Sequence, residues 1–355
     1  MIQNNIAVIR GDGIGIEVVE EGIKVLAAVS ENYDFELSFH EYPWSSKFYI
    51  DTGSMMPSDG LDTLSNHDAI FLGAVGHPDI QDHITLNGLL LPIRRKFDQY
   101  VCERPSVLFE GIESPLSGKK PFDIDMVVIR ENTEGEYANV GGFQYMDFPE
   151  EVGIQTGVFT RKGCERVIRY SFELARRRNK KKHLTSITKS NAQGYGMLVW
   201  DRAFERISPE YPDISTDSLL VDAAAMDFIR KPEYFDVVVA SNLFGDILTD
   251  IAAIITGSMG LASSANLDPE RRYPSMFEPV HGSAPDIMGK GIANPMAQIL
   301  TGAMLLRHLG HADAATDVEK AVLSVLSEGE ILTPDLFGSS TTSSVGDSIV
   351  SALGK

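Results

Sequence analysis

Short runs of β-branched and other apolar residues alternate along this sequence with longer segments of helical periodicity, and that alternation constrains the fold most. The runs that predict strands cover residues 6–9, 69–72, 126–129, 152–159, 184–188 and 237–240. The segments that predict helices cover residues 14–29, 89–97, 162–179, 192–207, 247–255, 296–309 and 314–327. Such alternation is typical of α/β proteins, in which helices cover the sheet.

Length, charge and cysteine content narrow the class of protein further. A chain of 355 residues without a visible linker predicts about two domains, which share strands and enclose a cleft. Lys and Arg number 31 against 50 Asp and Glu, so the net charge of −19 argues against nucleic acid or an anionic membrane as partner. No apolar run approaches the ~20 residues that span a bilayer. Cys102 and Cys164 cannot make a disulfide framework or a cysteine zinc site, and we expect a cytoplasmic protein.

The segment VIRGDGIGIEVVEEG follows the first predicted strand and opens the first predicted helix, as a dinucleotide-binding loop does. A G-x-G-x-x-G fingerprint that began at Gly11 would need glycine at position 16, where Ile16 stands. No acidic residue follows at the usual offset after a second strand. We therefore interpret the segment as a tight strand-to-helix turn and expect any cofactor to be bound elsewhere.

Three aspartates next to apolar segments are candidate metal ligands. Asp246 and Asp250 are four residues apart in SNLFGDILTDIAA, so on a helix they share one face, with Cβ atoms about 5–6 Å apart. Asp222 ends another apolar run and would be costly to bury alone. Oxygen ligands without Cys or His suit Mg²⁺ or Mn²⁺ rather than Zn²⁺. The spacing alone leaves an N-cap or a surface acid as the alternative for each aspartate.

Three arginines, a tyrosine and a lysine also stand at the ends of apolar segments: Arg94, Arg104, Arg130, Tyr137 and Lys189. A planar guanidinium group binds a carboxylate through two hydrogen bonds, so the arginines predict an anion site within an acidic protein. Lys189 is a candidate general base. A structural salt bridge for each arginine, and an ordinary surface position for the lysine, remain the alternatives.

Several motifs together resemble one known family, the β-decarboxylating dehydrogenases of 2-hydroxy acids, which includes isopropylmalate, isocitrate, homoisocitrate and tartrate/D-malate dehydrogenases. The motifs are EPVHGSAPDIMGKGIANPMAQIL, SNLFGDILTD, RENTEGEY, TKSN and the arginine segment RR…RP. The resemblance implies an α/β, isopropylmalate dehydrogenase-like fold and not a Rossmann fold. It implies two domains that share a large mixed sheet with helices on both faces and an active-site cleft between the domains. The cofactor domain would comprise residues 1–98 and 256–355, and the domain for substrate, metal and dimerisation residues 99–255.

The resemblance implies that Arg94, Arg104 and Arg130 bind the carboxylates of a small 2-hydroxy diacid. Isocitrate enzymes place Ser and Asn before the first arginine to bind a third carboxylate, whereas Gly88 and Leu90 stand here. Leu90 could instead face an isopropyl group, as in isopropylmalate dehydrogenases. Flanking segments such as RENTEGEYANVGG and VFTRKG look more like tartrate/D-malate dehydrogenases.

The resemblance also implies the metal site and the acid–base groups. Mn²⁺ or Mg²⁺ would be bound by Asp222, Asp246 and Asp250, and a monovalent cation such as K⁺ is a further candidate. Tyr137 and Lys189 match the acid–base pair, with Asp222 relaying the proton. Because Lys189 and Asp222 would come from the other subunit, the resemblance implies a homodimer with shared active sites.

For the cofactor, the resemblance implies NAD bound by the loop around HGSAPD. The implied contact residues are Gly73, Ala74, Val75, Asn191, Glu278, His281, Gly282, Ser283, Ala284, Asp286 and Asn294. Small residues in this loop allow close approach of the backbone to the adenosine. Asp286 would accept hydrogen bonds from the ribose hydroxyls and repel a 2′-phosphate, and Ile287 offers no cation to bind one, so we predict NAD over NADP.

The reaction that follows is NAD- and metal-dependent oxidative decarboxylation of D-malate to pyruvate and CO₂, with tartrate as a further substrate. 3-Isopropylmalate is the alternative substrate. Outside enzymes, the alternative is a catalytically silent regulatory subunit, which is disfavoured because every acid–base and metal position is intact.

Overall fold

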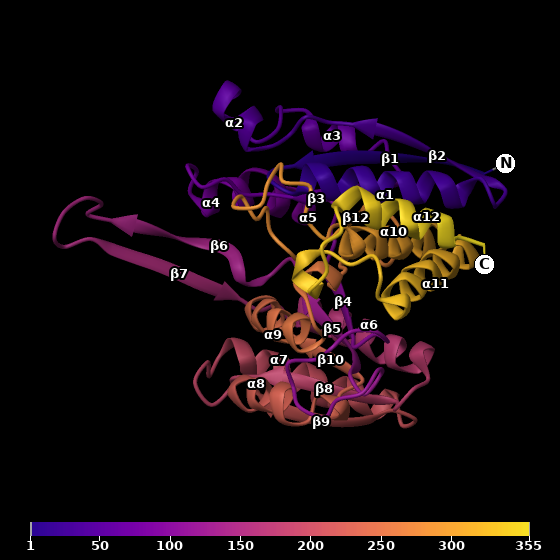
Figure 1. Cartoon of the computed structure of the whole chain (residues 1–355). Helices are drawn as coiled ribbons and strands as arrows, with labels where there is room; N and C mark the ends of the chain where they lie inside the picture. The colour runs from indigo at the N-terminus through magenta and orange to yellow at the C-terminus, as the bar shows by residue number, and fades with distance from the viewer. Residues whose placement is uncertain (1, 355) are drawn as a thin grey trace. The chain divides into compact units, whose positions relative to one another are not determined.

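The computed structural model describes residues 2–354, which divide into two compact units (Figure 1). Unit 1 contains the residues up to Gln99, Arg104–Ile124 and the residues from Ala253 onward, and unit 2 contains Tyr100–Glu103 and Asp125–Ala252. The predicted division has its boundaries after residues 98 and 255. Residues 104–124, which that prediction assigns to the second domain, belong to unit 1.

Local contacts explain why residues 104–124 belong to unit 1. The N–H of Leu108 donates to the carbonyl oxygen of Ile124, so the two ends of the segment are joined. The Ser114 hydroxyl donates to the carbonyl oxygen of Ile255 over 2.6 Å. Gly111, at φ +84°, packs so closely that an added Cβ would lie 2.0 Å from the carbonyl oxygen of Leu326. The segment is therefore held by C-terminal parts of the chain.

Unit 1 contains a mixed sheet: β1 pairs in parallel with β2 and β3, β3 pairs in parallel with β12, and β11 pairs antiparallel with β12. In order across the sheet, its strands are β2 (Phe35–Glu41), β1 (Ile2–Gly11), β3 (Ala69–Ala74), β12 (Ser275–Phe277) and β11 (Ala265–Leu267). β4 (Val101–Val107) begins in unit 2 and ends in unit 1.

Helices cover both faces of the unit 1 sheet. They are α1 (Gly15–Ser30), α2 (Ser46–Thr52), α3 (Gly60–Leu64), α4 (Asp82–Thr85), α5 (Leu91–Lys96), α10 (Met296–Leu309), α11 (Ala312–Glu328) and α12 (Thr342–Ala352). Successive side chains of a strand point to opposite faces. In β3, Ile70 and Leu72 join a buried cluster with side chains of α3 and α5, whereas Phe71 lies against Gly22 of α1, and Gln298 of α10 lies beside the same glycine.

The predicted helix at residues 89–97 is only partly right, because the chain there is not one regular α-helix. α4 is followed by a π-helical turn at Leu86–Leu90 and then by α5. Pro92 lies in the first turn of α5 and has no N–H for an α-helical hydrogen bond. The N–H of Leu91 donates to Leu86, five residues back, and this wider turn accommodates the proline.

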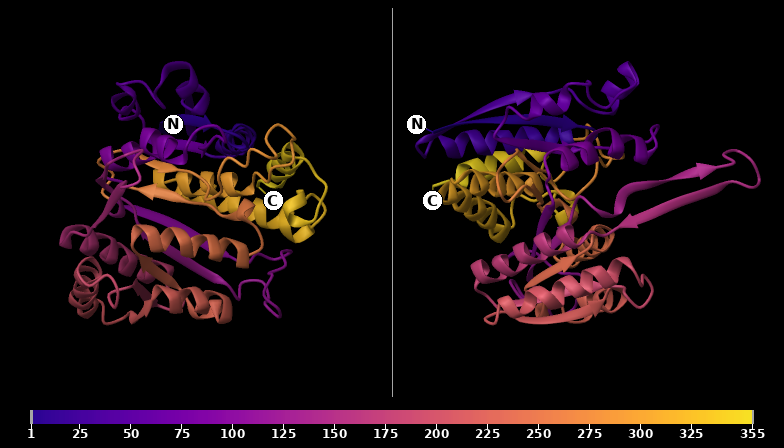
Figure 2. Two further views of the ribbon diagram at one scale, coloured as in Figure 1. Left: turned by 90° about the vertical axis from the view of Figure 1, so that its left-hand side faces the viewer. Right: turned by 180° about the vertical axis from the view of Figure 1, so that it is seen from behind.

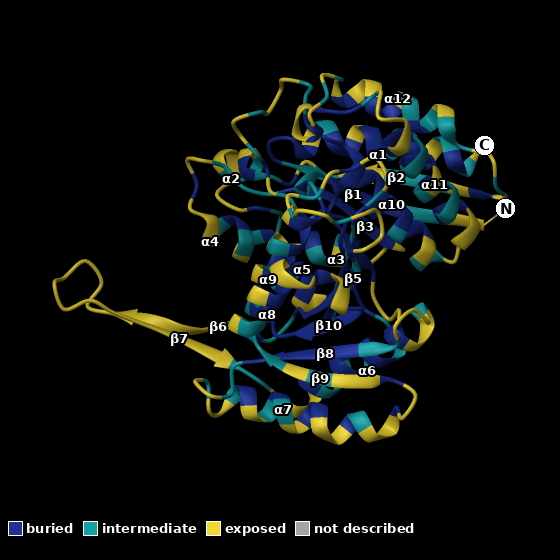
Figure 3. Ribbon diagram, turned by 60° about the horizontal axis from the view of Figure 1, so that its bottom comes forward, coloured by how far each residue is buried: buried dark blue, intermediate teal, exposed yellow. Residues whose placement is uncertain are grey.

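Unit 2 contains four parallel strands with helices packed on them. In order across the sheet, the strands are β5 (Asp125–Glu131), β10 (Val237–Ala240), β8 (His183–Thr188) and β9 (Ser215–Leu220). The helices are α6 (Arg161–Arg178), α7 (Gly196–Ile207), α8 (Val221–Arg230) and α9 (Asn242–Ile255). α6 contacts β5, β8 and β10, and α8 contacts β8 and β9. β10 is buried throughout, which explains its unbroken apolar sequence (Figure 3).

A two-stranded antiparallel arm extends from the rest of unit 2, as Figures 1 and 2 show. It consists of β6 (Gly135–Gln144) and β7 (Val152–Val158). From Asn139 to Gly157 its residues are exposed, so the expectation that helices cover the sheets does not hold for this pair.

Short 3₁₀ turns complete the described chain: Ser208–Glu210, Pro232–Tyr234, Met259–Leu261 and Pro334–Leu336. Within residues 2–354, each helix is too short or too polar to cross a membrane.

Candidate active site

Three of the predicted site residues meet in unit 2. Arg130 stands near the end of β5, Tyr137 near the start of β6, and Asp246 in the first turns of α9. The Tyr137 hydroxyl donates to Oδ2 of Asp246 over 3.0 Å, and Nη1 of Arg130 donates to Oδ1 of the same carboxylate. The guanidinium carbon of Arg130 also lies 5.2 Å from the centre of the Tyr137 ring. One carboxylate therefore holds both a cation and a phenol.

Asn242, which the sequence analysis did not single out, fixes the guanidinium group of Arg130. Its Oδ1 accepts hydrogen bonds from Nε at 2.9 Å and from Nη2 at 2.8 Å, while its Nδ2 donates to the carbonyl oxygen of Glu134. Arg130 is only 2% exposed, so these bonds replace water that burial removes. The sequence signal that could have identified Asn242 is its position as a polar residue between an apolar strand and an apolar helix.

Glycine allows α9 to approach Arg130 closely. A Cβ added to Gly245 would lie 2.6 Å from Cβ of Arg130. At the start of the same helix, the Glu136 carboxylate accepts hydrogen bonds from the Ser241 hydroxyl and the N–H of Leu243, both at 3.2 Å. The motifs RENTEGEY and SNLFGD are therefore parts of one hydrogen-bonded structure.

Lys189 and Asp222 form a second pair in unit 2. Nζ of Lys189, just beyond β8, donates to Oδ1 of Asp222, in the first turn of α8, over 2.7 Å. This hydrogen bond lowers the pKa of Asp222 below its ordinary value. The Asp222 side chain is 60% exposed, and so can be reached from outside the chain.

A single chain does not bring the three predicted metal ligands together. Asp250 follows Asp246 by one helical turn of α9 and is exposed. Among residues 2–354, no three His, Cys, Asp or Glu side chains lie close enough to hold a metal ion, so Asp222 does not join the other two. The donors that α9 offers are carboxylate oxygens, which fit Mg²⁺ or Mn²⁺.

In unit 1, Arg94 forms a buried ion pair with Glu278, over 2.6 Å between Nη2 and Oε1. Asn266 donates to the same oxygen over 2.8 Å. The salt-bridge alternative considered for Arg94 is therefore present, and Glu278, expected to contact the cofactor, has this arginine as its partner. Arg104 is buried in β4. Leu90 packs into a hydrophobic cluster of unit 1, so its side chain is part of the core.

The residues expected around the adenosine follow β12. Gly282 and Asp286 are exposed, and an added Cβ at Gly282 would meet no heavy atom within 4 Å, so the loop has open space beside it. Ala284 adopts φ +40°, in the left-handed region that favours glycine. Burial lowers the pKa of His281, and its Nε2 is buried without a hydrogen-bond partner among the described residues. A buried ring nitrogen without a partner is unusual, and it fits a loop that binds a polar ligand.

The remaining predicted cofactor residues have different surroundings. Gly73 and Ala74 end β3, with Val75 directly after it. The amide of Asn294 is used within the chain, because Nδ2 donates to Asp335 and Oδ1 accepts from the N–H of Met296, both at 3.0 Å. Asn191 is exposed and belongs to unit 2.

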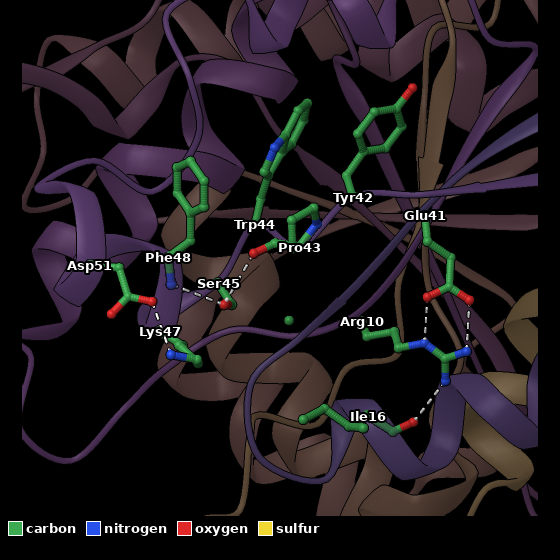
Figure 4. A pocket seen from close by; sticks show the side chains of 11 residues that line it. Arg10, Ile16, Glu41, Tyr42, Pro43, Trp44, Ser45, Lys47, Phe48 and Asp51 are labelled. Carbon is green, nitrogen blue, oxygen red and sulfur yellow. Dashed lines mark hydrogen bonds and ion pairs between the residues drawn. The ribbon is translucent and has the colours of Figure 1, made fainter.

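A pocket of about 630 Å³ in unit 1 contains none of the predicted site residues (Figure 4). It lies at the ends of β1 and β2 and the start of α2. The guanidinium group of Arg10 is held there by Glu41, at 2.9 and 2.8 Å, and by Glu20, at 2.6 Å. Because two carboxylates already neutralise this cation, the pocket does not have the charge of an anion site.

Known proteins resemble this chain over its whole length. It is 52% identical over 351 residues to the D-malate dehydrogenase [decarboxylating] of Escherichia coli (strain K12), covering 97% of each chain. It is 48% identical over 358 residues to the tartrate dehydrogenase/decarboxylase of Pseudomonas putida, covering 99% of this chain and 98% of that one. The crystal structure of isocitrate dehydrogenase from Methylococcus capsulatus matches with a TM-score of 0.89 at 36% identity, covering 99% of this chain and 100% of that chain.

These matches confirm the predicted fold: a large mixed sheet with helices on both faces, and not a Rossmann fold. They also confirm the prediction of an oxidoreductase, because the relatives are decarboxylating dehydrogenases. Residues 5–349 match the family described as isocitrate/isopropylmalate dehydrogenase. With nearly the whole chain matched and relatives about half identical to it, the chain belongs to the isocitrate/isopropylmalate dehydrogenase family.

Proposed function

We propose that the protein catalyses NAD-dependent, divalent-metal-dependent oxidative decarboxylation of D-malate to pyruvate and CO₂, and that it also oxidises tartrate. The observation that carries the proposal is the cluster in which Asp246 binds both Arg130 and Tyr137. This cluster combines a carboxylate-binding cation, an oxygen ligand for a metal ion and a proton donor. The named activities of the relatives support this choice of substrates.

Substrate carboxylates are proposed to bind the arginines Arg94, Arg104 and Arg130. All three are buried, so charge-assisted hydrogen bonds to them form with little competition from water. Nε of Arg94 is buried without a hydrogen-bond partner among the described residues, which supports a donor kept for a ligand.

Asp246 and Asp250 are proposed to hold Mn²⁺ or Mg²⁺ together with Asp222 of a second copy. When bound, such an ion lowers the pKa of a coordinated hydroxyl and stabilises negative charge on an adjacent oxygen. The Asp246 carboxylate, which binds Arg130 and Tyr137, offers oxygen atoms of the type that Mg²⁺ and Mn²⁺ prefer.

Lys189 and Tyr137 are proposed to transfer the protons. Lys189, hydrogen-bonded to Asp222, would accept the proton of the C2 hydroxyl while C2 passes its hydride to NAD⁺. The resulting ketone lies β to the second carboxylate, so the bond to that carboxylate breaks, CO₂ leaves and an enolate remains. The Tyr137 hydroxyl would then protonate the enolate carbon, which yields pyruvate.

NAD is proposed to bind the loop at residues 281–286. The exposed Asp286 carboxylate is an acceptor for ribose hydroxyls, and it would repel the 2′-phosphate of NADP. The unpaired Nε2 of His281 and the open space at Gly282 fit a ligand on this loop.

A homodimer is proposed because the candidate ligands lie on exposed apolar surfaces. On α8, Asp222 shares a helix face with the exposed Met226 and Ile229, and on α9 Asp250 shares one with the exposed Ile247. The arm carries further exposed apolar side chains: Val140, Phe143, Tyr145, Met146, Phe148, Val152 and Ile154. Large exposed apolar patches are typical of protein interfaces, and a second copy would complete the metal site.

The test is NADH formation from D-malate, D-tartrate and 3-isopropylmalate, each with Mn²⁺ and with a chelator. We expect metal-dependent NADH and pyruvate from D-malate, with the highest kcat/KM of the three. Faster turnover of 3-isopropylmalate would replace the proposed substrate by the alternative. Failure to form NADH from any 2-hydroxy diacid would support a regulatory subunit.

A further inference from the structure

The strand-to-helix turn at residues 11–15 holds a buried carboxylate that has no part in the proposed chemistry. Asp12 is 7% exposed, and its side chain accepts three hydrogen bonds. Oδ1 accepts from the N–H of Ser46 at 2.8 Å, and Oδ2 accepts from the Ser46 hydroxyl at 2.7 Å and the N–H of Gly76 at 3.0 Å. A buried charge is costly unless donors compensate it, and three donors from two separate segments do so here.

The backbone of the same turn joins the two candidate cofactor segments. The N–H of Asp12 donates to the carbonyl oxygen of Ala74 over 2.7 Å. Two residues later, the N–H of Ile14 donates to the carbonyl oxygen of Ser283 over 2.8 Å. Ala74 belongs to the segment 73–76 and Ser283 to the loop 281–286, so three residues of the turn contact both.

Glycine makes these contacts as close as the backbone permits. Gly11 and Gly13 have φ values of +72° and +58°, which glycine adopts without strain. A Cβ at Gly11 would lie 1.9 Å from the carbonyl oxygen of Ala74, and one at Gly13 would lie 1.9 Å from that of Ser283. The turn thus has only the first two glycines of a G-x-G-x-x-G loop, and both pack against the chain itself.

We propose that Asp12 is a positioning residue of the cofactor site: by binding Gly76 and Ser46 it holds segment 73–76 and, through the turn, loop 281–286 at the spacing that NAD requires. This inference rests on the proposed function, because it assumes that both segments contact NAD. Displacing one contact segment by about 1 Å costs a rigid ligand much of its affinity. Asp12 does not touch reacting atoms, so its effect should appear in NAD binding.

The test compares Asp12→Asn and Ser46→Ala with the unaltered protein by calorimetric titration of NAD. Asparagine keeps the size of the side chain, but its NH₂ group replaces one acceptor oxygen of Asp12. That NH₂ group would face donors of Ser46 and Gly76. We expect the Kd for NAD to rise about tenfold in Asp12→Asn and less in Ser46→Ala, with kcat at saturating NAD changed less than threefold. Amide hydrogen exchange should become faster at residues 74–76 and 281–286.

Asp236→Asn is the matched control. Asp236 is a fully buried carboxylate of unit 2 that accepts a 3.0 Å hydrogen bond from Arg178, so its loss should destabilise the fold without changing NAD affinity. If the Asp12→Asn variant does not fold, NAD affinity and amide exchange are compared between Ser46→Ala and the unaltered protein. Unchanged NAD affinity and exchange in the folded variants overturns the inference alone. Absence of NAD binding by the unaltered protein overturns the proposed function and this inference with it.

Discussion

The Tyr137 hydroxyl donates a 3.0 Å hydrogen bond to Oδ2 of Asp246, and Arg130 binds the other oxygen of the same carboxylate. A group proposed to bind substrate, one proposed to bind metal and one proposed to transfer a proton are therefore in direct contact. Residues that share a hydrogen-bonded network do not act independently, so a change at one should alter the others.

Tyr137→Phe should separate binding from catalysis. The phenyl ring keeps the contact with Arg130 but loses the hydroxyl that would protonate the enolate carbon. We expect kcat for D-malate to fall about 100-fold or more, as is usual for loss of a general acid, with KM changed only a few-fold. Steady-state kinetics checks this. Full turnover by the variant would remove Tyr137 from the mechanism.

Asn242→Ala should weaken substrate binding through Arg130. The guanidinium group would lose both of its hydrogen bonds to Asn242 Oδ1 and could leave its present orientation. Hydrogen bonds to charged groups contribute about 1.5–3 kcal/mol, so we expect KM for D-malate to rise at least tenfold. Asn66→Ala, which removes a surface amide bonded to Asp62 and Thr63, is the control and should leave KM unchanged. An unaltered KM in Asn242→Ala would show that Arg130 needs no such support.

Regular elements with strong apolar patterns could be predicted from the sequence. β10 and α10 have the predicted bounds of 237–240 and 296–309, because each is buried almost throughout and its apolar residues report that burial. β9 and α8 were missed. The sequence STDSLL of β9 is polar and largely exposed, and the short α8 places Asp222 in its first turn rather than at the end of a strand.

The residue types of the site could be predicted from the sequence, but not all of the residues that contact them. The aspartates, arginines, Tyr137 and Lys189 stand at the ends of apolar segments, and the motifs around them resemble one family. The roles of Asp12 and Asn242 depend on contacts with residues 34 to 112 positions away in the chain. No local pattern reports such contacts. The Arg94–Glu278 pair, 184 residues apart, was hidden for the same reason.

Asp286→Lys should move cofactor preference toward NADP. We expect the unaltered protein to prefer NAD, because the exposed carboxylate accepts ribose hydroxyls and repels a 2′-phosphate. Lysine reverses the charge, so the ratio of kcat/KM for NADP to that for NAD should rise about 10- to 100-fold. Asp313→Lys, the same exchange at an exposed position of α11, is the control. Equal use of both cofactors by the unaltered protein would contradict the role of Asp286.

His308→Gln should change how stability depends on pH. Burial, aided by the cation of Arg271, lowers the pKa of His308 from 6.5 to about 4. Between these values the unfolded chain binds a proton that the folded chain does not. The stabilisation from a neutral His308 is therefore complete above pH 6.5 and is lost as pH falls toward 4.

In the unaltered protein, protonation of His308 should lower the free energy of unfolding by about 3 kcal/mol at most, since each pKa unit corresponds to about 1.4 kcal/mol. A glutamine side chain at position 308 does not titrate, so the free energy of unfolding of the variant should lack this part of its dependence on pH. Thermal unfolding at several pH values gives the comparison: the difference in Tm should be constant above pH 7 and shift in favour of the variant below pH 6.5. Parallel Tm curves down to pH 4 would show that His308 ionises alike in the folded and unfolded chains.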